Sequence, residues 1–208
     1  FDEESIDAYI VPHEDEFLTE YVPNHSERLS FITGFTGSAG LTIITKNKAA
    51  IFVDGRYTTQ VKLETSMKIF DYHDLNNTDI ENWIRKNIKQ KSQIGFCPMT
   101  VSLDKLTSFK NLVSNTKIIF KKTDNLIDKI WLERPNQNNG LIYKHKSRFS
   151  GASHKEKKQL IIKEIIKEGC DSLFISEPEN NCWFLNIRGD DLESVSYTHL
   201  RAHETRPN

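Results

Sequence analysis

The residues that most suggest chemistry are three evenly spaced glycines, Gly34, Gly37 and Gly40, in the stretch FITGFTGSAG at 31–40. Glycine-rich loops bind phosphate when G-x-G-x-x-G follows a strand, or when the loop ends in Gly-Lys-Ser/Thr. Here the spacing is G-x-x-G-x-x-G, a helical pattern precedes it, and no lysine lies between Gly34 and Thr45. The stretch therefore predicts a tight structural corner, since glycine permits positive φ and close backbone approach.

Two further motifs resemble catalytic signatures but lack one required residue each. Ser38 lies two residues before Gly40, as in a nucleophile elbow, but Thr36 stands where that motif needs its first glycine. His199 and His203 are four residues apart, as in a zincin helix, but Leu200 stands where the glutamate base belongs. None of the seven histidines lies with carboxylates at ligand spacing. We therefore predict no catalytic residue and no metal ligand in this sequence.

Charge and cysteine content narrow the class of partner and compartment. The formal net charge is −1, from 28 basic and 29 acidic residues, which gives no electrostatic reason to expect nucleic acid. No apolar run approaches the roughly 20 residues that a membrane helix needs, so we expect no membrane partner. Cys97, Cys170 and Cys182 form no CxxC pair and are expected to be small apolar fillers in a reducing cytosol. The start FDEESIDAYIVP lacks the order of a signal peptide, so the protein is expected to be cytoplasmic.

Strand-like and helical patterns alternate along the chain, which predicts an α/β layer fold. Strands are expected at 7–12, 41–45, 50–54, 68–73, 93–97, 116–122 and 170–176, with 41–45 and 50–54 forming a hairpin. Helices are expected at 26–33, 56–65, 79–90, 102–114, 126–134, 154–168 and 178–188. Ser153 and Glu156 fit a capping box, and Trp83, Trp131 and Trp183 fall at apolar helical positions that predict core packing.

Sequence blocks along the whole chain resemble one enzyme family. The strongest block is HSERLSFITGFTGSAG, followed by an apolar hairpin and DGRY; DAYIVPHEDEFLTEYVP, NLIDKIWLERP and NCWFLNIRGDDL add to it, in the expected order over residues 7–192. These blocks resemble the long, three-domain form of the Xaa-Pro aminopeptidases, in the creatinase and prolidase superfamily. The resemblance implies a creatinase N-terminal-like mixed sheet flanked by helices at 1–134, a linker at 135–139, and a truncated second copy at 140–193. The tail at 194–208 breaks the pattern and is expected to be disordered or artefactual.

The family removes the N-terminal residue from peptides with proline second, and its catalytic domain holds two divalent metals, commonly manganese. No position here matches those ligands, so the resemblance implies an N-terminal fragment that binds no cofactor and is inactive alone. In the intact enzyme it would shape substrate access for proline-containing peptides and contribute to a homodimer. The second copy would lack strands and expose apolar surface.

Arg56, in DGRY, matches the arginine that reaches toward the substrate cleft in the long-form family. A guanidinium can donate to a peptide carbonyl or carboxylate. The structural alternatives are an exposed arginine or an ion pair with Asp54. A catalytically dead peptide- or protein-binding module of the same superfamily, like the aminopeptidase-like region of histone-chaperone large subunits, is the alternative function.

Overall fold

The computed structural model of the chain describes residues 1–19, 21–137 and 140–189. Two compact units divide it: unit 1 comprises Phe1–Glu16 and Val22–Pro135, and unit 2 comprises Phe17–Tyr21 and the residues from Asn136 onward. His199, His203, the GDDL aspartates and the tail predicted at 194–208 lie outside the described residues.

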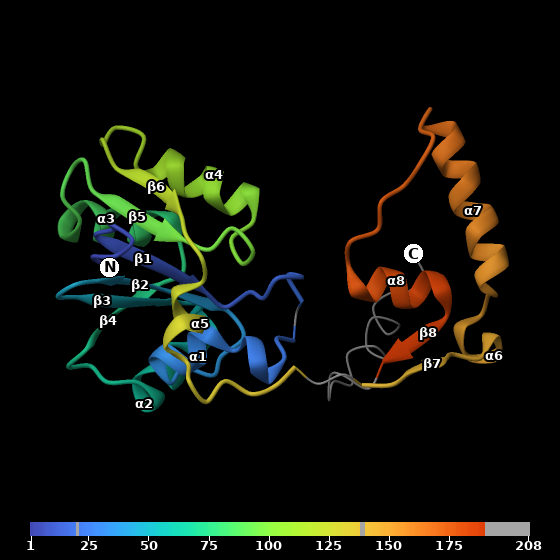
Figure 1. Ribbon diagram of the computed structural model, residues 1–208, viewed down its shortest axis with the longest axis horizontal. Helices are drawn as coiled ribbons and strands as arrows, with labels where there is room; N and C mark the ends of the chain where they lie inside the picture. The colour runs from blue at the N-terminus through green and yellow to red at the C-terminus, as the bar shows by residue number, and fades with distance from the viewer. Residues whose placement is uncertain (20, 138–139, 190–208) are drawn as a thin grey trace. The chain divides into compact units, whose positions relative to one another are not determined.

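Unit 1 is built on one mixed β-sheet (Figure 1). Its strands follow the spatial order β4-β3-β2-β1-β5-β6. The β1–β2 and β2–β3 pairs are antiparallel, whereas β3–β4, β1–β5 and β5–β6 are parallel. The strand bounds are β1 Ala8–Pro12, β2 Gly40–Thr45, β3 Ala49–Val53, β4 Phe70–Asp74, β5 Gln93–Phe96 and β6 Ile119–Lys122.

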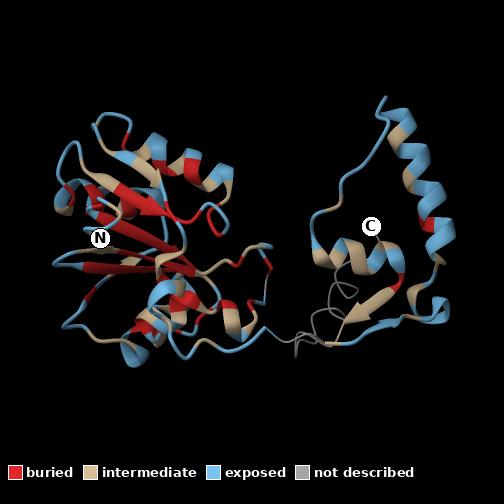
Figure 2. Ribbon diagram, in the orientation of Figure 1, coloured by how far each residue is buried: buried red, intermediate tan, exposed pale blue. Residues whose placement is uncertain are grey.

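The central strands are buried on both faces, which explains their nearly continuous apolar sequences (Figure 2). Ala50 and Phe52 of β3 belong to the larger core cluster, together with residues of two helices. Ala49 and Ile51 belong to a second cluster on the opposite face. This alternation follows from the two-residue period of a strand.

Helices cover both faces of the sheet, as Figure 1 shows. The larger cluster is completed by α3 (Asn77–Asn87) and α4 (Leu103–Leu112), which begin at side-chain caps from Asn76 and Ser102. The other face carries α1 (Arg28–Thr33), α2 (Gln60–Glu64) and α5 (Leu126–Ile130). Two short 3₁₀ helices, η1 Asn24–Ser26 and η2 Gly55–Tyr57, precede α1 and α2. The predicted fold class, a mixed sheet flanked by helices, is confirmed.

Unit 2 contains less regular structure in its described part. Strands β7 (Ile142–Lys144) and β8 (Ile187–Gly189) form an antiparallel pair that the sequence patterns had not indicated. Three helices lie between them: α6 (Ser147–Ser150), α7 (His154–Lys167) and α8 (Pro178–Leu185). The capping box predicted at the start of α7 is present, with both of its hydrogen bonds.

The strand predicted at 170–176 is wrong. The structure gives this segment no strand, and its Phe174 side chain is 89% exposed. An isolated strand leaves its ladder groups unpaired, and no described strand lies beside this one to pair with them. Two expectations of burial also fail here, because Cys170 is exposed and Trp183 is 47% exposed. Among the described residues, no helix has both the length and the apolar character to cross a membrane.

Candidate substrate-facing site

Two polar segments flank the start of β2 at the edge of the unit 1 sheet where the parallel strands end. Asp54 directly follows β3 and His13 directly follows β1, on either side of the start of β2. The Asp54 amide donates to the carbonyl of Ala39 (3.4 Å), and the His13 amide donates to that of Gly40 (3.0 Å). Ligands of α/β sheets bind beyond this carboxyl edge, so its polar residues are the first candidates for a functional site.

Arg56 lies at this edge and is held by Asp54. The Asp54 side chain caps η2, where Oδ1 accepts from the Arg56 backbone amide (3.0 Å) and from Arg56 Nε (2.8 Å). The hydrogen bonds from Arg56 hold the pKa of Asp54 below its usual value, and the same pair raises the pKa of Arg56. The Arg56 side chain is still 70% exposed. The ion pair proposed as a structural alternative is therefore present, and it leaves the terminal guanidinium nitrogens facing solvent.

Tyr57 anchors the backbone beside Arg56. Its hydroxyl lies 2.7 Å from Ser38 Oγ, and its ring meets Phe35 edge to face, with centroids 5.7 Å apart. The Arg56 guanidinium carbon lies 5.3 Å from the centroid of the Tyr57 ring, a cation–π distance. Ser38 thus has the Tyr57 hydroxyl as its hydrogen-bond partner.

The glycine run forms the corner that supports Tyr57. Gly34 ends α1 in the left-handed region, with φ of 82°. A Cβ on Gly37 would lie 2.2 Å from Phe35 Cζ and 2.9 Å from Tyr57 Cδ1. Glycine is therefore required here by conformation and by close approach, as the sequence predicted, and the run packs rings together.

Glu64, at the end of α2, holds the segment between Gly34 and Gly37 by hydrogen bonds. Its carboxylate accepts hydrogen bonds from the Thr36 amide (2.8 Å) and hydroxyl (2.7 Å) and from Gln60 Nε2 (2.9 Å). Desolvation raises the pKa of Glu64, but these hydrogen bonds outweigh it and the net pKa lies below its usual value. The segment between Gly34 and Gly37 is thus fixed at both ends.

His13 and Glu14 continue the row of polar groups beyond β1. Burial lowers the pKa of His13, against the opposing charges of Glu14 and Asp15. The Glu14 carboxylate pairs with Lys105 at the start of α4. Among the described residues, His13 Nε2 and Glu14 Oε2 are buried without a hydrogen-bond partner. Neither residue stands out by type or spacing in the sequence.

A buried ion network, also missed from sequence, lies at Arg28, which is only 3% exposed. Its guanidinium donates to Asp128 Oδ1 (2.6 Å) and to Glu16 Oε1 (2.5 Å), and Asp128 also pairs with Arg134 (2.9 Å). Desolvation lowers the pKa of Arg28, but the hydrogen bonds to Asp128 and Glu16 raise it above its ordinary value. The network joins the segment that follows β1 to α1 and α5.

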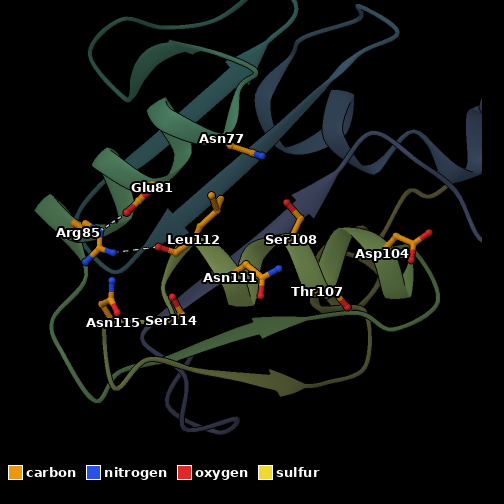
Figure 3. Close-up of a pocket in the computed structure, with 10 residues that line it drawn as sticks. All are labelled: Asn77, Glu81, Arg85, Asp104, Thr107, Ser108, Asn111, Leu112, Ser114 and Asn115. Carbon is orange, nitrogen blue, oxygen red and sulfur yellow. Dashed lines mark hydrogen bonds and ion pairs between the residues drawn. The ribbon is translucent and has the colours of Figure 1, made fainter.

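The described residues contain no group of three or more histidine, cysteine, aspartate or glutamate side chains that could hold a metal ion. A polar hollow of about 490 Å³ lies between α3 and α4, away from Arg56 (Figure 3). Its one cation, Arg85, already donates to Glu81 (2.7 Å) and to the Leu112 carbonyl (3.2 Å). This hollow offers amides and hydroxyls but no nucleophile paired with a base.

Comparison with protein-family models gives two matches. Residues 1–130 match the creatinase/prolidase N-terminal domain, and residues 133–203 match a second model of the same description. The first match alone covers more than half of the 208 residues.

Curated relatives align with about nine-tenths of this chain. The chain is 32% identical over 193 residues to Xaa-Pro aminopeptidase 2 of Homo sapiens, covering 91% of this chain and 29% of the relative. It is 33% identical over 192 residues to Xaa-Pro aminopeptidase ApepP of Drosophila melanogaster, covering 90% of this chain and 31% of that one. The chain therefore spans about 30% of the length of these relatives.

A crystal structure of X-prolyl aminopeptidase from Caenorhabditis elegans shares the fold. It matches with a TM-score of 0.82 and 24% identity over 90% of this chain and 31% of that one. That protein is described as a cytosolic enzyme with a di-nuclear active site.

Proposed function

The chain belongs to the creatinase/prolidase N-terminal domain family, and from that membership we propose that it is the non-catalytic N-terminal part of a metal-dependent Xaa-Pro aminopeptidase. Such an enzyme removes the N-terminal residue from peptides with proline second. The relatives that match over about nine-tenths of this chain are aminopeptidases of that kind. In this proposal the chain shapes access to the substrate and takes part in a homodimer, and the enzyme is cytoplasmic.

The single structural observation that supports this role is the arrangement of Arg56. Asp54 uses one oxygen to hold both the backbone amide and Nε of Arg56. This leaves Nη1 and Nη2 exposed as a planar pair of donors, the geometry that suits a peptide carbonyl or carboxylate. Arg56 would bind and orient the peptide from the edge of unit 1.

The metal chemistry is proposed to come from a part of the enzyme outside this chain. The described residues do not fit a metal centre, because no group of suitable ligands lies together. We therefore propose that residues 1–19, 21–137 and 140–189 supply no catalytic residue and hold no cofactor. We also propose the domain boundaries 1–134, 135–139 and 140–193; the break between the two family matches, at 130–133, lies a few residues before this linker.

Activity measurements test both halves of the proposal. The purified 208-residue chain should not hydrolyse a tripeptide with proline second, with or without manganese. Hydrolysis that a chelator abolishes and manganese restores would refute the assignment. In the full-length enzyme, Arg56→Ala should lower kcat/KM about tenfold or more, as expected for the loss of a charge-assisted hydrogen bond to substrate.

Two control variants separate a substrate contact from a structural effect. Lys62→Ala removes a nearby exposed cation of α2 and should leave kcat/KM unchanged. Arg56→Lys keeps the charge but loses the planar donor pair, and should recover only part of the activity. Unchanged cleavage by Arg56→Ala would exclude the substrate role while leaving the family membership intact.

A further inference from the structure

A second groove of unit 1 lies between the edge strand β4 and the helix α3. Its volume is about 540 Å³. Asp71 and His73 line it from β4, and Asp79, Asn82 and Lys86 line it from α3. It lies away from Arg56, which is not among its lining residues.

Charges of opposite sign lie at the two ends of this groove. Asp79 is near the end of β4, because its Oδ2 accepts from the Asp74 amide (3.2 Å). Lys48 is near the start of β4, because it precedes Ala49, which pairs with Phe70. Lys86 is two helical turns from Asp79, roughly 10 Å along the α3 axis. The groove thus presents the Asp79 carboxylate at one end and the Lys48 and Lys86 ammonium groups at the other, where the Asp71 carboxylate accepts from Trp83 Nε1 (3.1 Å) and leaves one net positive charge.

The floor of the groove is an open strand edge. The Leu75 amide donates to the Val53 carbonyl of β3 (2.8 Å). Main-chain groups alternate along a strand, so the amides of Phe70, Tyr72 and Asp74 point away from β3. Of the outward amides, that of Phe70 is bonded to Ser66 (3.0 Å) and that of Asp74 is bonded to Asp79. The remaining outward amide is that of Tyr72, a residue that lines the groove. The Tyr72 hydroxyl lies 2.8 Å from Thr65 Oγ1. β4 has no strand beyond it among the described residues.

His73 adds a buried ring nitrogen without a hydrogen-bond partner among the described residues to the side of the groove formed by β4. Its ring stacks on Phe52, with centroids 5.3 Å apart, which fixes its orientation. Its Nε2 is buried and has no partner among the described residues. A buried polar atom without a partner is costly, so a ligand that supplies one gains affinity there.

We propose that this groove binds a short extended peptide with free termini, two or three residues long. Extended chain spans at most about 3.3–3.6 Å per residue, so three residues match the distance from Asp79 to Lys86. The peptide ammonium faces Asp79 and its carboxylate faces Lys86 and Lys48. The peptide therefore runs antiparallel to β4, and its central residue exchanges two main-chain hydrogen bonds with Tyr72. This inference does not depend on the function proposed for Arg56.

Titration of the ¹⁵N-labelled 208-residue chain with Ala-Ala-Ala tests the site. The amide signals of Tyr72, His73 and Lys86 should shift together and saturate. N-acetylated, C-amidated Ala-Ala-Ala should bind about fivefold more weakly or worse, because it lacks both terminal charges. Ala-Pro-Ala should also bind more weakly, since its central residue has no N–H to donate. A substrate site of a proline-specific enzyme would show the opposite preference.

A charge reversal at one end supplies the matched control. Lys86→Glu should weaken Ala-Ala-Ala binding about fivefold, whereas Lys110→Glu on α4, with the same charge change away from the groove, should have no effect. C-amidation of the peptide should cost affinity for the unaltered chain and none for Lys86→Glu. Equal binding of the blocked peptide, equal loss in both variants, or an absence of shifts at Tyr72 would overturn the proposal. So would Tyr72 shifts that follow protein concentration alone, which would assign the groove to a second copy of the chain.

Discussion

Replacing Gly37 with alanine should destabilise unit 1 without touching any charged group. The added Cβ would lie 2.2 Å from Phe35 Cζ and 2.8 Å from Phe35 Cε2. Carbon atoms in contact prefer about 3.5–4.0 Å, so the ring must retreat by roughly 1 Å or more. Phe35 is only 1% exposed and its ring meets Tyr57 edge to face. The Phe35 ring therefore cannot relieve this clash by moving into solvent.

The expected cost is that of overpacking a well-filled core, about 1–3 kcal/mol. Gly55 supplies the matched control, because nothing lies within 4 Å of the Cβ that alanine would add there. Gly55→Ala should be neutral or stabilising by up to about 1 kcal/mol, through the lower entropy of the unfolded chain. The two variants make the same chemical change about twenty residues apart, with opposite expected signs.

Hydrogen exchange measures this free energy for unit 1 alone. The Ile43 and Phe52 amides belong to central strands and have side chains with 0% exposure, so their exchange reports opening of the whole sheet. Gly37→Ala should lower the protection free energy of both amides by the cost given above, and Gly55→Ala should not. Equal protection in both variants would refute the view that the glycine run exists to pack the two rings.

Two further predictions concern charge. Arg28→Met should lower the protection free energy by about 3–5 kcal/mol in the same exchange measurement, because Glu16 and Asp128 lose their buried partner. The control Lys46→Met breaks an exposed pair with Asp2 and should show no measurable change. An equally small change for Arg28→Met would refute the contribution of the network to stability. The pKa of Glu64 lies below its ordinary value of 4.5, so its hydrogen bonds stabilise the fold fully above that pH and are lost as the pH falls through the folded pKa. In Thr36→Val the carboxyl titration followed by NMR should move up toward 4.5, and an unmoved titration would contradict the assigned cause.

Local signals in the sequence were sufficient for most of unit 1. The hairpin of β2 and β3 follows from two β-rich runs with a short polar turn between them. Such features depend on residues within a few positions of one another. They are readable because tertiary contacts agree with them.

The features that the sequence did not predict depend on distant partners. Arg28 meets Glu16 twelve positions away and Asp128 one hundred positions away, and no periodicity marks such a pair. β7 and β8 have three residues each and pair across more than forty residues. The strand predicted at 170–176 was wrong because it also depended on a distant partner. A β-rich composition makes a strand only where a neighbouring strand accepts its hydrogen bonds.

The glycine corner and Arg56 form one mechanical unit, although no glycine contacts the arginine. Tyr57 is fixed by the Phe35 ring and the Ser38 hydroxyl, and its neighbour Arg56 is fixed by the cap from Asp54. A guanidinium whose backbone and Nε are already ordered loses less conformational entropy when its terminal nitrogens bind a ligand. A side chain at Gly37 that displaced Tyr57 would therefore weaken binding through Arg56 as well as the packing of the core. Three glycines that resemble a phosphate loop support the candidate site in this way, because they hold rigid Tyr57, the residue next to the arginine that we propose to bind the peptide.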